Sequence, residues 1–393
     1  AAYRSLEDPH ARGIAAYALA RALLFVGDPQ RAADIASEAR QGLGEEARDV
    51  ALIVESVELI SIYFGAEVPD AAARFEALRA LPAEPAGGES VLAAAASYDW
   101  LYRGGTAEEC ADLASRAMER AAQMELDTGL TWIVANVVLV AADRPEALEM
   151  WDRALARSHR QGGMFGVMTV HLWRGFTQLR HGDLEAAEES LRAGIEQINL
   201  LRGATLDYAH GLLALTLLER GHPEEASEAL HAIPRPEGIG DGTLLWRVAE
   251  IELMLAEGRG EEALQAALRH AEACDWRINP AFATSLSLQG RALAMLGRTE
   301  EAVEVMSREL DLAERWGAPG TIGRTLRILG EMRQADGAGE LERAIELLER
   351  SPMKLDLAKA LAALGGVVRR GRKPSDARDP LRRAYELAEV CVA

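Results

Sequence analysis

Apolar side chains recur along this chain at helical spacing, in runs that short polar turns interrupt. Residues 169–195, TVHLWRGFTQLRHGDLEAAEESLRAGI, show one cycle: an apolar run ends near Gly182, and a run rich in Glu and Ala follows. Apolar positions three and four residues apart share one face of an α-helix. The pattern therefore predicts pairs of amphipathic helices joined by tight turns.

The turns recur at a nearly constant interval along the whole chain, which indicates a repeat architecture. Gly supplies the left-handed conformation that ends a first helix, and Asp, Thr or Ser can cap the next, or Pro can begin it. Thr106 and Glu109 have the spacing of a capping box. The predicted turn residues are Gly27, Gly65, Gly104, Asp143, Gly182, Gly221, Gly258, Gly297, Asp336 and Gly371.

Each unit is a helical hairpin of roughly 39 residues, which is too small to bury its own apolar face and gains a core only by stacking on its neighbours. The sequence therefore predicts an all-α fold, a single solenoid of about ten hairpins over residues 1–393. Connections rich in Pro and Gly at residues 81–90 and 233–242 do not interrupt the period of the repeat. We interpret them as loops between units and not as domain boundaries.

The turn sequences GDLEAAEESL and GRTEEAVEVM resemble the tetratricopeptide repeat (TPR), and the length of the period resembles its longer, MalT-like form. This resemblance implies a right-handed superhelix whose first helices line a concave groove.

The last unit, residues 351–393, resembles the final repeat before the DNA-binding domain of large ATP-binding LuxR-type transcriptional regulators. The family pattern is close to R-L-E-x-A-R-A-L-x-x-L-G-x-x-L-R-R-x-x-R-x-x-x-A-R-x-P-L-R-x-A-x-x-L-A. The matching residues are Leu355, Ala358, Ala360, Leu361, Leu364, Gly365, Arg369, Arg370, Arg372, Ala377, Arg378, Pro380, Leu381, Arg382, Ala384, Leu387 and Ala388.

The resemblance implies attached ATPase and DNA-binding domains in a full-length regulator. Within residues 1–393, no lysine lies in a GxxxxGK[ST] phosphate-binding loop, and no helix-turn-helix follows the last repeat. We therefore assign neither ATP hydrolysis nor DNA binding to this chain.

The composition of the chain argues against several classes of function. The net charge of −19 argues against direct nucleic-acid binding, because a phosphate backbone is met by clustered Lys and Arg. Three isolated cysteines offer neither a disulfide framework nor a zinc knuckle. The uncharged runs are shorter than a membrane span, and the chain does not open on a signal sequence. We expect a soluble, cytoplasmic protein.

Catalytic patterns are also missing. The eight histidines include no HExxH, and no predicted strand leads into the Gly-rich stretches at residues 238–242 and 317–323. We expect a protein that is not an enzyme and that binds no metal or cofactor.

One column of residues could form a ligand groove. Trp132, His171 and His210 recur once per repeat, and equivalent offsets stack into a line along a solenoid. Rings, Arg, His and amides suit ligand binding. The alternative is that bulky residues at this offset wedge one hairpin on the next. The candidate groove residues are Trp132, Asn136, His171, Arg174, His210, Arg247, Glu250 and Gln289.

A basic segment near the C-terminus contains Arg369, Arg370, Arg372 and Arg378. We predict that it contacts a neighbouring domain or a partner. The alternative is a solvated face, which is the usual location of a charge run.

The favoured function is a sensor module of a LuxR-type regulator, in which an inducer or partner protein in the groove biases the attached domains. The alternative is a TPR adaptor that binds peptide segments of other proteins. A reading frame that contains both a phosphate-binding loop and a helix-turn-helix would favour the first.

Overall fold

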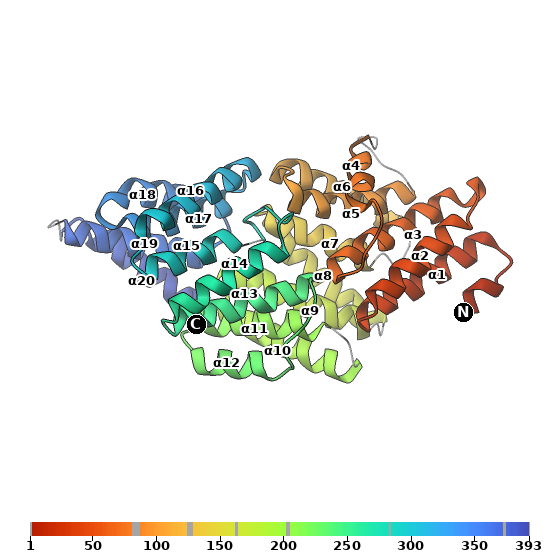
Figure 1. Cartoon of the computed structure of the whole chain (residues 1–393), viewed down its shortest axis with the longest axis horizontal. Helices are drawn as coiled ribbons and strands as arrows, with labels where there is room; N and C mark the ends of the chain where they lie inside the picture. Colours follow the sequence, from red (N-terminus) through yellow and green to blue (C-terminus); the bar gives the residue numbers. More distant parts are fainter. Residues whose placement is uncertain are drawn as a thin grey trace.

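The computed structural model of the chain is built from α-helices and short 3-10 helices, and its described residues contain no strand. Successive helices pair into hairpins that stack in chain order, from the N-terminal units at one end to the C-terminal units at the other (Figure 1). The prediction of an all-α solenoid is confirmed. The structure describes residues 2–80, 87–123, 129–161, 164–201, 205–282, 284–371 and 375–392.

Ten hairpins are formed by the described residues, as the repeat predicts. In most of them the first helix is the more apolar one. The first helices are α1 (Pro9–Phe25), α3 (Arg48–Ile60), α5 (Gly88–Arg103), α7 (Gly129–Ala141), α9 (Met164–His181), α11 (Leu206–Glu219), α13 (Asp241–Ala256), α15 (Ser285–Met295), α17 (Pro319–Arg333) and α19 (Lys354–Arg370).

The second helices are amphipathic, with one face on the hairpin and the other in solvent. They are α2 (Pro29–Gln41), α4 (Ala71–Ala77), α6 (Ala107–Gln123), α8 (Glu146–Gln161), α10 (Leu184–Leu201), α12 (Pro223–His231), α14 (Gly260–Ala273), α16 (Thr299–Trp316), α18 (Ala338–Leu348) and α20 (Arg378–Val392). The 3-10 helices are η1 (Ala2–Ser5), η2 (Glu45–Ala47), η3 (Ser61–Phe64), η4 (Leu78–Ala80) and η5 (Gln334–Gly337).

The predicted turn chemistry is confirmed in eight of the ten hairpins, where the predicted residue has a positive φ. The range runs from 58° at Asp143 to 104° at Gly104. The Oγ1 atom of Thr106 accepts a hydrogen bond of 3.2 Å from the backbone N–H of Glu109. This bond caps α6, as the spacing of the two residues predicts.

Two predicted turns are wrong in detail. At Asp336 the chain forms η5, and the positive φ of 51° belongs to Gln334. Gly337 there lies so close to Gly330 that an added Cβ atom would be 2.1 Å from the Gly330 carbonyl oxygen. The tight crossing of α17 and α18 replaces the ordinary glycine turn. At Gly371, φ is −70° and no left-handed residue is needed.

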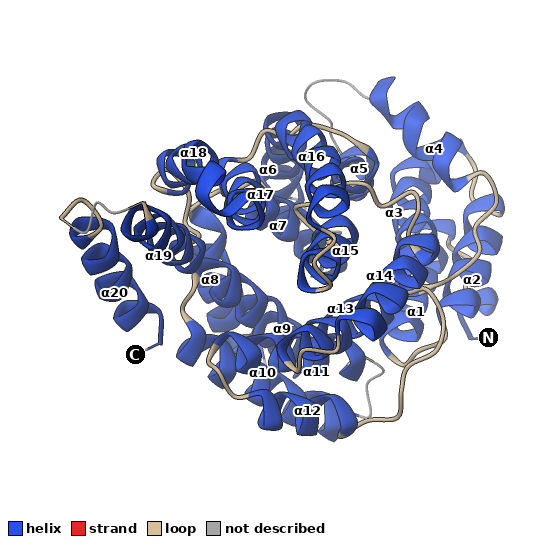
Figure 2. Ribbon diagram, turned by 60° about the vertical axis from the view of Figure 1, so that its left-hand side comes forward, coloured by secondary structure: helices blue, strands red, loops and turns tan. Residues whose placement is uncertain are grey.

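The chain winds about a common axis, with first helices such as α7, α13 and α15 on the inside and second helices such as α12 and α18 outside (Figure 2). The winding is tight enough for the early hairpins to contact the late ones. The backbone N–H of Ile278 donates to the Tyr102 carbonyl at 3.0 Å, and the Trp316 indole donates to the Ala141 carbonyl at 3.1 Å. We call this contact region the inter-turn interface.

A buried ion pair lies at the centre of the inter-turn interface. The Asp241 carboxylate, at the start of α13, accepts two hydrogen bonds of 2.9 and 3.1 Å from Arg277. It also accepts hydrogen bonds from the hydroxyls of Tyr98 and Tyr102, at 3.0 and 2.9 Å. Both charged side chains are at most 4% exposed. A buried carboxylate is tolerated because every oxygen has a donor.

Aromatic rings and guanidinium groups surround this ion pair. The Trp276 ring lies between the guanidinium groups of Arg103 and Arg277, at 4.3 and 4.1 Å from the ring centroid. Tyr63 donates a hydrogen bond of 2.8 Å to Asp99, and burial raises the pKa of that carboxyl. The two superhelical turns are therefore joined by specific polar contacts as well as by apolar packing.

Candidate functional site

The predicted groove column does not face the superhelix axis. Trp132 packs edge to face on Trp151 of α8, with ring centroids 5.0 Å apart. Asn136 is fully buried, and its amide donates a 3.1 Å hydrogen bond to the Ala147 carbonyl. His171 is half-buried on the side of α9 where its Cβ atom approaches Gly194 of α10. These side chains face second helices.

Arg174 and His210 behave in the same way. The Arg174 guanidinium bridges Asp152 and Ser190, at 2.7 and 2.9 Å, and so connects α8 with α10. The Nδ1 atom of His210 lies 2.7 Å from the Ala229 carbonyl oxygen of α12. Burial lowers the pKa of both His171 and His210, and the positive charge of Arg174 lowers the pKa of His171 further. The contacts of these residues agree with the alternative interpretation, in which the column packs one helix on the next, and ligand binding by the column stays a prediction.

The remaining column residues are divided between two environments. Gln289 is buried in α15. Arg247 donates a 3.0 Å hydrogen bond to the Gly238 carbonyl, and Glu250 accepts one of 2.7 Å from Arg235. Both line an outer pocket beside the loop that leads into α13. None of the three lines the axial pocket of these hairpins, and their role in ligand binding stays a prediction.

The basic C-terminal segment is on the surface of the last hairpin. Arg369 and Arg370 are exposed at the end of α19, and Arg378 is exposed at the start of α20. Arg372 lies outside the described residues. Their exposure agrees equally with a solvated face and with a contact surface, so the predicted partner contact stays a prediction.

The axial side of the early hairpins is occupied by apolar side chains. A narrow cavity of about 30 Å³ remains there, with Tyr63, Ile133, Leu172, Trp173 and Tyr208 among its lining residues. All five are less than 9% exposed. This half of the interior is an aromatic core with little room for a ligand.

The axial side of the late hairpins is open and charged. A pocket of about 450 Å³ is lined by residues of α11, α13, α15, α17 and α19. Its floor is apolar, and each of the five first helices contributes a charged side chain. We call the set Glu219, Glu252, Arg291, Glu331 and Lys359 the inner charged pocket.

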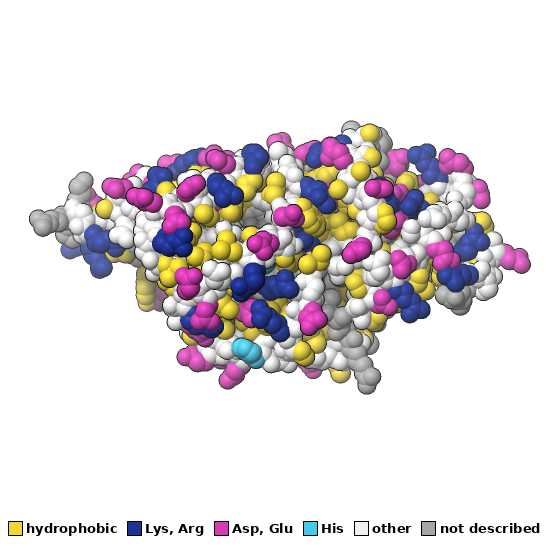
Figure 3. Space-filling model, in the orientation of Figure 1, with side chains coloured by type: hydrophobic (Ala, Val, Ile, Leu, Met, Phe, Trp, Pro, Cys, Tyr) yellow, Lys and Arg dark blue, Asp and Glu magenta, His cyan; other side chains and the backbone are white. Residues whose placement is uncertain are grey.

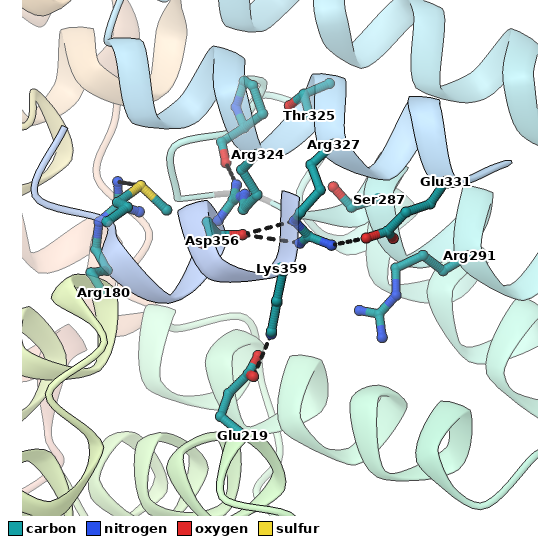
Figure 4. A network of polar contacts seen from close by, with 12 residues as sticks. Arg180, Glu219, Ser287, Arg291, Arg324, Thr325, Arg327, Glu331, Asp356 and Lys359 are labelled. Carbon is teal, nitrogen blue, oxygen red and sulfur yellow. Dashed lines mark hydrogen bonds and ion pairs between the residues drawn. The ribbon is translucent and has the colours of Figure 1, made fainter. Parts of the chain in front are cut away.

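Four of the five charges of the inner charged pocket are paired with one another in the free protein. Lys359 reaches from α19 to Glu219 on α11 (Figure 4). Arg291 lies 2.5 Å from Glu252. Their side chains are between 22 and 40% exposed, so water reaches each pair. Ion pairs of this exposure contribute little to stability, about 0 to 1 kcal/mol. They can therefore exchange partners at low cost.

Arg327 lies at the buried side of this network and pairs with two carboxylates. Its guanidinium lies 3.0 Å from Asp356 and 2.9 Å from Glu331. Burial alone would raise the pKa of Asp356, but Arg327 and Lys359 outweigh it and keep that pKa below its usual value. The carboxylate is therefore ionised at neutral pH, and the pocket presents fixed charges of both signs.

This arrangement suits an extended polypeptide. An apolar floor offers contacts for side chains, while carboxylates and guanidinium groups on successive helices offer partners for charged groups along a chain.

Among the described residues, no three His, Cys, Asp or Glu side chains are grouped so that they could hold a metal ion. Of the helices that are described, none is long and apolar enough to cross a membrane.

The sequence also contains a periodic pattern that indicates the inner charged pocket, and the predicted column does not include it. Glu252 and Arg291 are separated by one period of the repeat and interrupt first helices that are otherwise rich in Ala and Leu. They stand two positions after Glu250 and Gln289, which is about 200° around a helix. The predicted column and the inner charged pocket therefore lie on different faces of the same first helices.

Comparison with known proteins supports the fold. No protein-family model matches the sequence, and a search of curated proteins finds no match. A structure titled as a Rap protein complexed with Competence and Sporulation Factor is similar over 96% of this chain and 98% of that chain, with a TM-score of 0.55 and 10% identity.

A chain of the APC/C hetero-tetramer Cut9-Hcn1 is similar over 94% of this chain and 68% of that chain, with a TM-score of 0.59 and 13% identity. At these identities the similarity shows the fold alone. It confirms the TPR-like solenoid and leaves the narrower resemblance to LuxR-type regulators a prediction.

Proposed function

We propose that this chain is a protein-interaction module without catalytic activity, and that it binds an extended segment of a partner protein in the inner charged pocket. The observation that carries the proposal is the presence of charged side chains from five consecutive first helices around one pocket of about 450 Å³. A ligand that spans these helices has to be elongated and polar. A peptide segment that carries both acidic and basic side chains has this chemistry.

The state of the pocket supports exchange with a ligand. Each exposed pair, such as Arg291 with Glu252, can be replaced by a pair with the peptide, so the net number of ion pairs is unchanged. The apolar floor, which includes Leu255, Ile328 and Met332, then supplies the favourable burial. The two similar structures described above are complexes, one of a Rap protein with Competence and Sporulation Factor and one of Cut9 with Hcn1.

Selection from a random peptide library displayed on phage tests the proposal. We expect enriched peptides with charged residues of both signs. Their affinity should fall by about tenfold or more in Arg291→Gln, because a charge-assisted hydrogen bond contributes about 1.5 to 3 kcal/mol. Arg298→Gln, on the exposed start of α16, is the matched control and should bind normally. Failure to enrich any peptide, or equal affinity of Arg291→Gln, would contradict the proposal.

A second candidate function is the sensor role in a LuxR-type regulator. The specific observation is the match of residues 351–393, which include α19 and α20 at the end of the solenoid. The exposed Arg369, Arg370 and Arg378 would then contact an attached domain. Sequencing the complete reading frame tests this: a phosphate-binding loop before this region and a helix-turn-helix after it are expected, and a frame without either excludes the role.

A further inference from the structure

A second pocket lies outside the superhelix axis, where the loop before α13 covers α13 and α14. Its volume is about 410 Å³, which is within the range of roughly 300 to 1,000 Å³ for small-molecule sites. Three arginines line it, Arg235, Arg247 and Arg269. Figure 3 shows Lys and Arg side chains gathered over α13 near the centre of this face. Such clustering is unexpected in a chain with a net charge of −19.

Two of these arginines form no ion pair within the described residues. Arg235 is paired with Glu250 at 2.7 Å. Arg247 and Arg269 form no ion pair with a carboxylate in the part of the chain that the structure describes, and Arg247 instead donates to the Gly238 carbonyl. A neutral carbonyl leaves the guanidinium charge in place. Glu237 and Glu250 also line the pocket, so the three arginines outnumber the carboxylates by one and the pocket is weakly positive.

His270 supplies an unpartnered polar group in the same pocket. Its side chain lines the pocket, the residue is only 3% exposed, and its Nδ1 atom has no hydrogen-bond partner among the described residues. Burial, together with the charges of Arg247 and Arg277, lowers the pKa of His270 to about 4. The ring is neutral at pH 7 and offers one N–H donor. A buried polar atom without a partner destabilises the free protein, and a ligand acceptor would relieve that cost.

We propose that this pocket binds a small phosphorylated molecule through its phosphoryl group. Arg247 and Arg269 donate charge-assisted hydrogen bonds to the phosphoryl oxygens, and the Nδ1–H of His270 donates a third. A phosphoryl group has three acceptor oxygens and a charge near −2, which matches two guanidinium groups and one neutral donor. The site is independent of the inner charged pocket, which lies on the other side of α13.

Calorimetry with inorganic phosphate tests the site on the whole chain. We expect binding to the natural protein that weakens by about tenfold or more, or about 1.4 kcal/mol, in the double variant Arg247→Gln, Arg269→Gln, because both charge-assisted contacts are lost. The double variant Arg298→Gln, Arg308→Gln removes the same net charge from an exposed helix and should bind phosphate normally. Acetate should bind more weakly than phosphate.

Three outcomes overturn the proposal: no phosphate binding at millimolar concentration, equal weakening in both double variants, or acetate binding as tightly as phosphate. Nuclear magnetic resonance of the histidine rings gives a readout that does not depend on substituted arginines. Phosphate should raise the pKa of one ring from about 4, and that resonance should be absent in His270→Asn. If phosphate leaves this ring unchanged, binding is elsewhere and the assignment is wrong.

Discussion

Single buried charges are the most specific features of this chain. Asp241 and Arg277 form an ion pair between superhelical turns, and Glu309 is a fully buried carboxyl on α16. The hydroxyls of Ser287 and Thr325 donate to Glu309, with distances of 2.5 to 2.9 Å. Hydroxyl donors compensate a carboxylate less well than a guanidinium does. The two carboxyls therefore have opposite consequences for stability.

Asp241→Ala should lower the free energy of unfolding by about 3 kcal/mol or more. The substitution leaves Arg277 and the hydroxyls of Tyr98 and Tyr102 buried without their acceptor, and breaking a buried ion pair costs about 3 to 5 kcal/mol. Chemical denaturation measures the change. Asp275→Ala, at an exposed position in the loop that contains Arg277, should change stability by less than about 1 kcal/mol. An equal effect of both substitutions would mean that the ion pair is not structural.

Glu309→Gln should stabilise the protein at neutral pH and not at acidic pH. Burial raises the folded-state pKa of Glu309 above its usual value of 4.5, so the natural protein loses stability as the pH rises toward the folded pKa. Gln is neutral throughout. We expect a gain in the free energy of unfolding near pH 8 that disappears toward pH 4. Glu304→Gln, on the exposed side of α16, should show no such trend, and a gain that is independent of pH would contradict the assignment.

At the scale of elements, the turn between α7 and α8 does more than reverse the chain. Asp143 has a φ of 58°, where most other units have Gly. Its carboxylate accepts a 2.5 Å hydrogen bond from the backbone N–H of Gly320, at the start of α17, and lies 3.7 Å from Arg180. Burial raises the pKa of this carboxyl, while Arg180 opposes the increase. The side chain joins three units of the solenoid.

Asp143→Gly should therefore destabilise the protein by about 2 kcal/mol, even though Gly is the better residue for a positive φ. Relief of the left-handed backbone contributes about 1 to 2 kcal/mol, and the larger entropy of Gly in the unfolded chain offsets part of it. Loss of the helix cap and of the Arg180 partner costs more. The same substitution at Asp70 is the control. Asp70 also has a positive φ, of 54°, but its side chain makes no capping hydrogen bond. Thermal unfolding should show stabilisation at Asp70; stabilisation at Asp143 would contradict the role of its carboxylate.

The repeat made the hairpins and most turns predictable because each turn needs a residue that tolerates a positive φ, and such residues recur at a visible period. The period does not specify how each first helix is rotated about its own axis. Positions such as Trp132 and His171 recur as regularly as Glu252 and Arg291, although only the second set faces the axis. The contacts between superhelical turns, such as Asp241 with Tyr98, join distant residues that no local pattern relates.

At the scale of the whole molecule, the interior of the superhelix is divided into two unlike halves. The early hairpins fill their axis with aromatic side chains such as Tyr63, Trp173 and Tyr208. The late hairpins leave theirs open and place charges around it. The inter-turn interface fixes one half against the other. A partner segment therefore meets a rigid, preorganised surface, and preorganisation reduces the ordering cost of binding.

A charge-swap measurement with a selected peptide tests the central claim most directly. Arg291→Glu should weaken binding of that peptide, because it places a carboxylate beside Glu252 and any acidic peptide side chain. A peptide whose acidic residue is replaced by Lys should bind Arg291→Glu at least about tenfold more tightly than the original peptide does. If no single reversal in the peptide restores affinity, the segment is not held by the inner charged pocket.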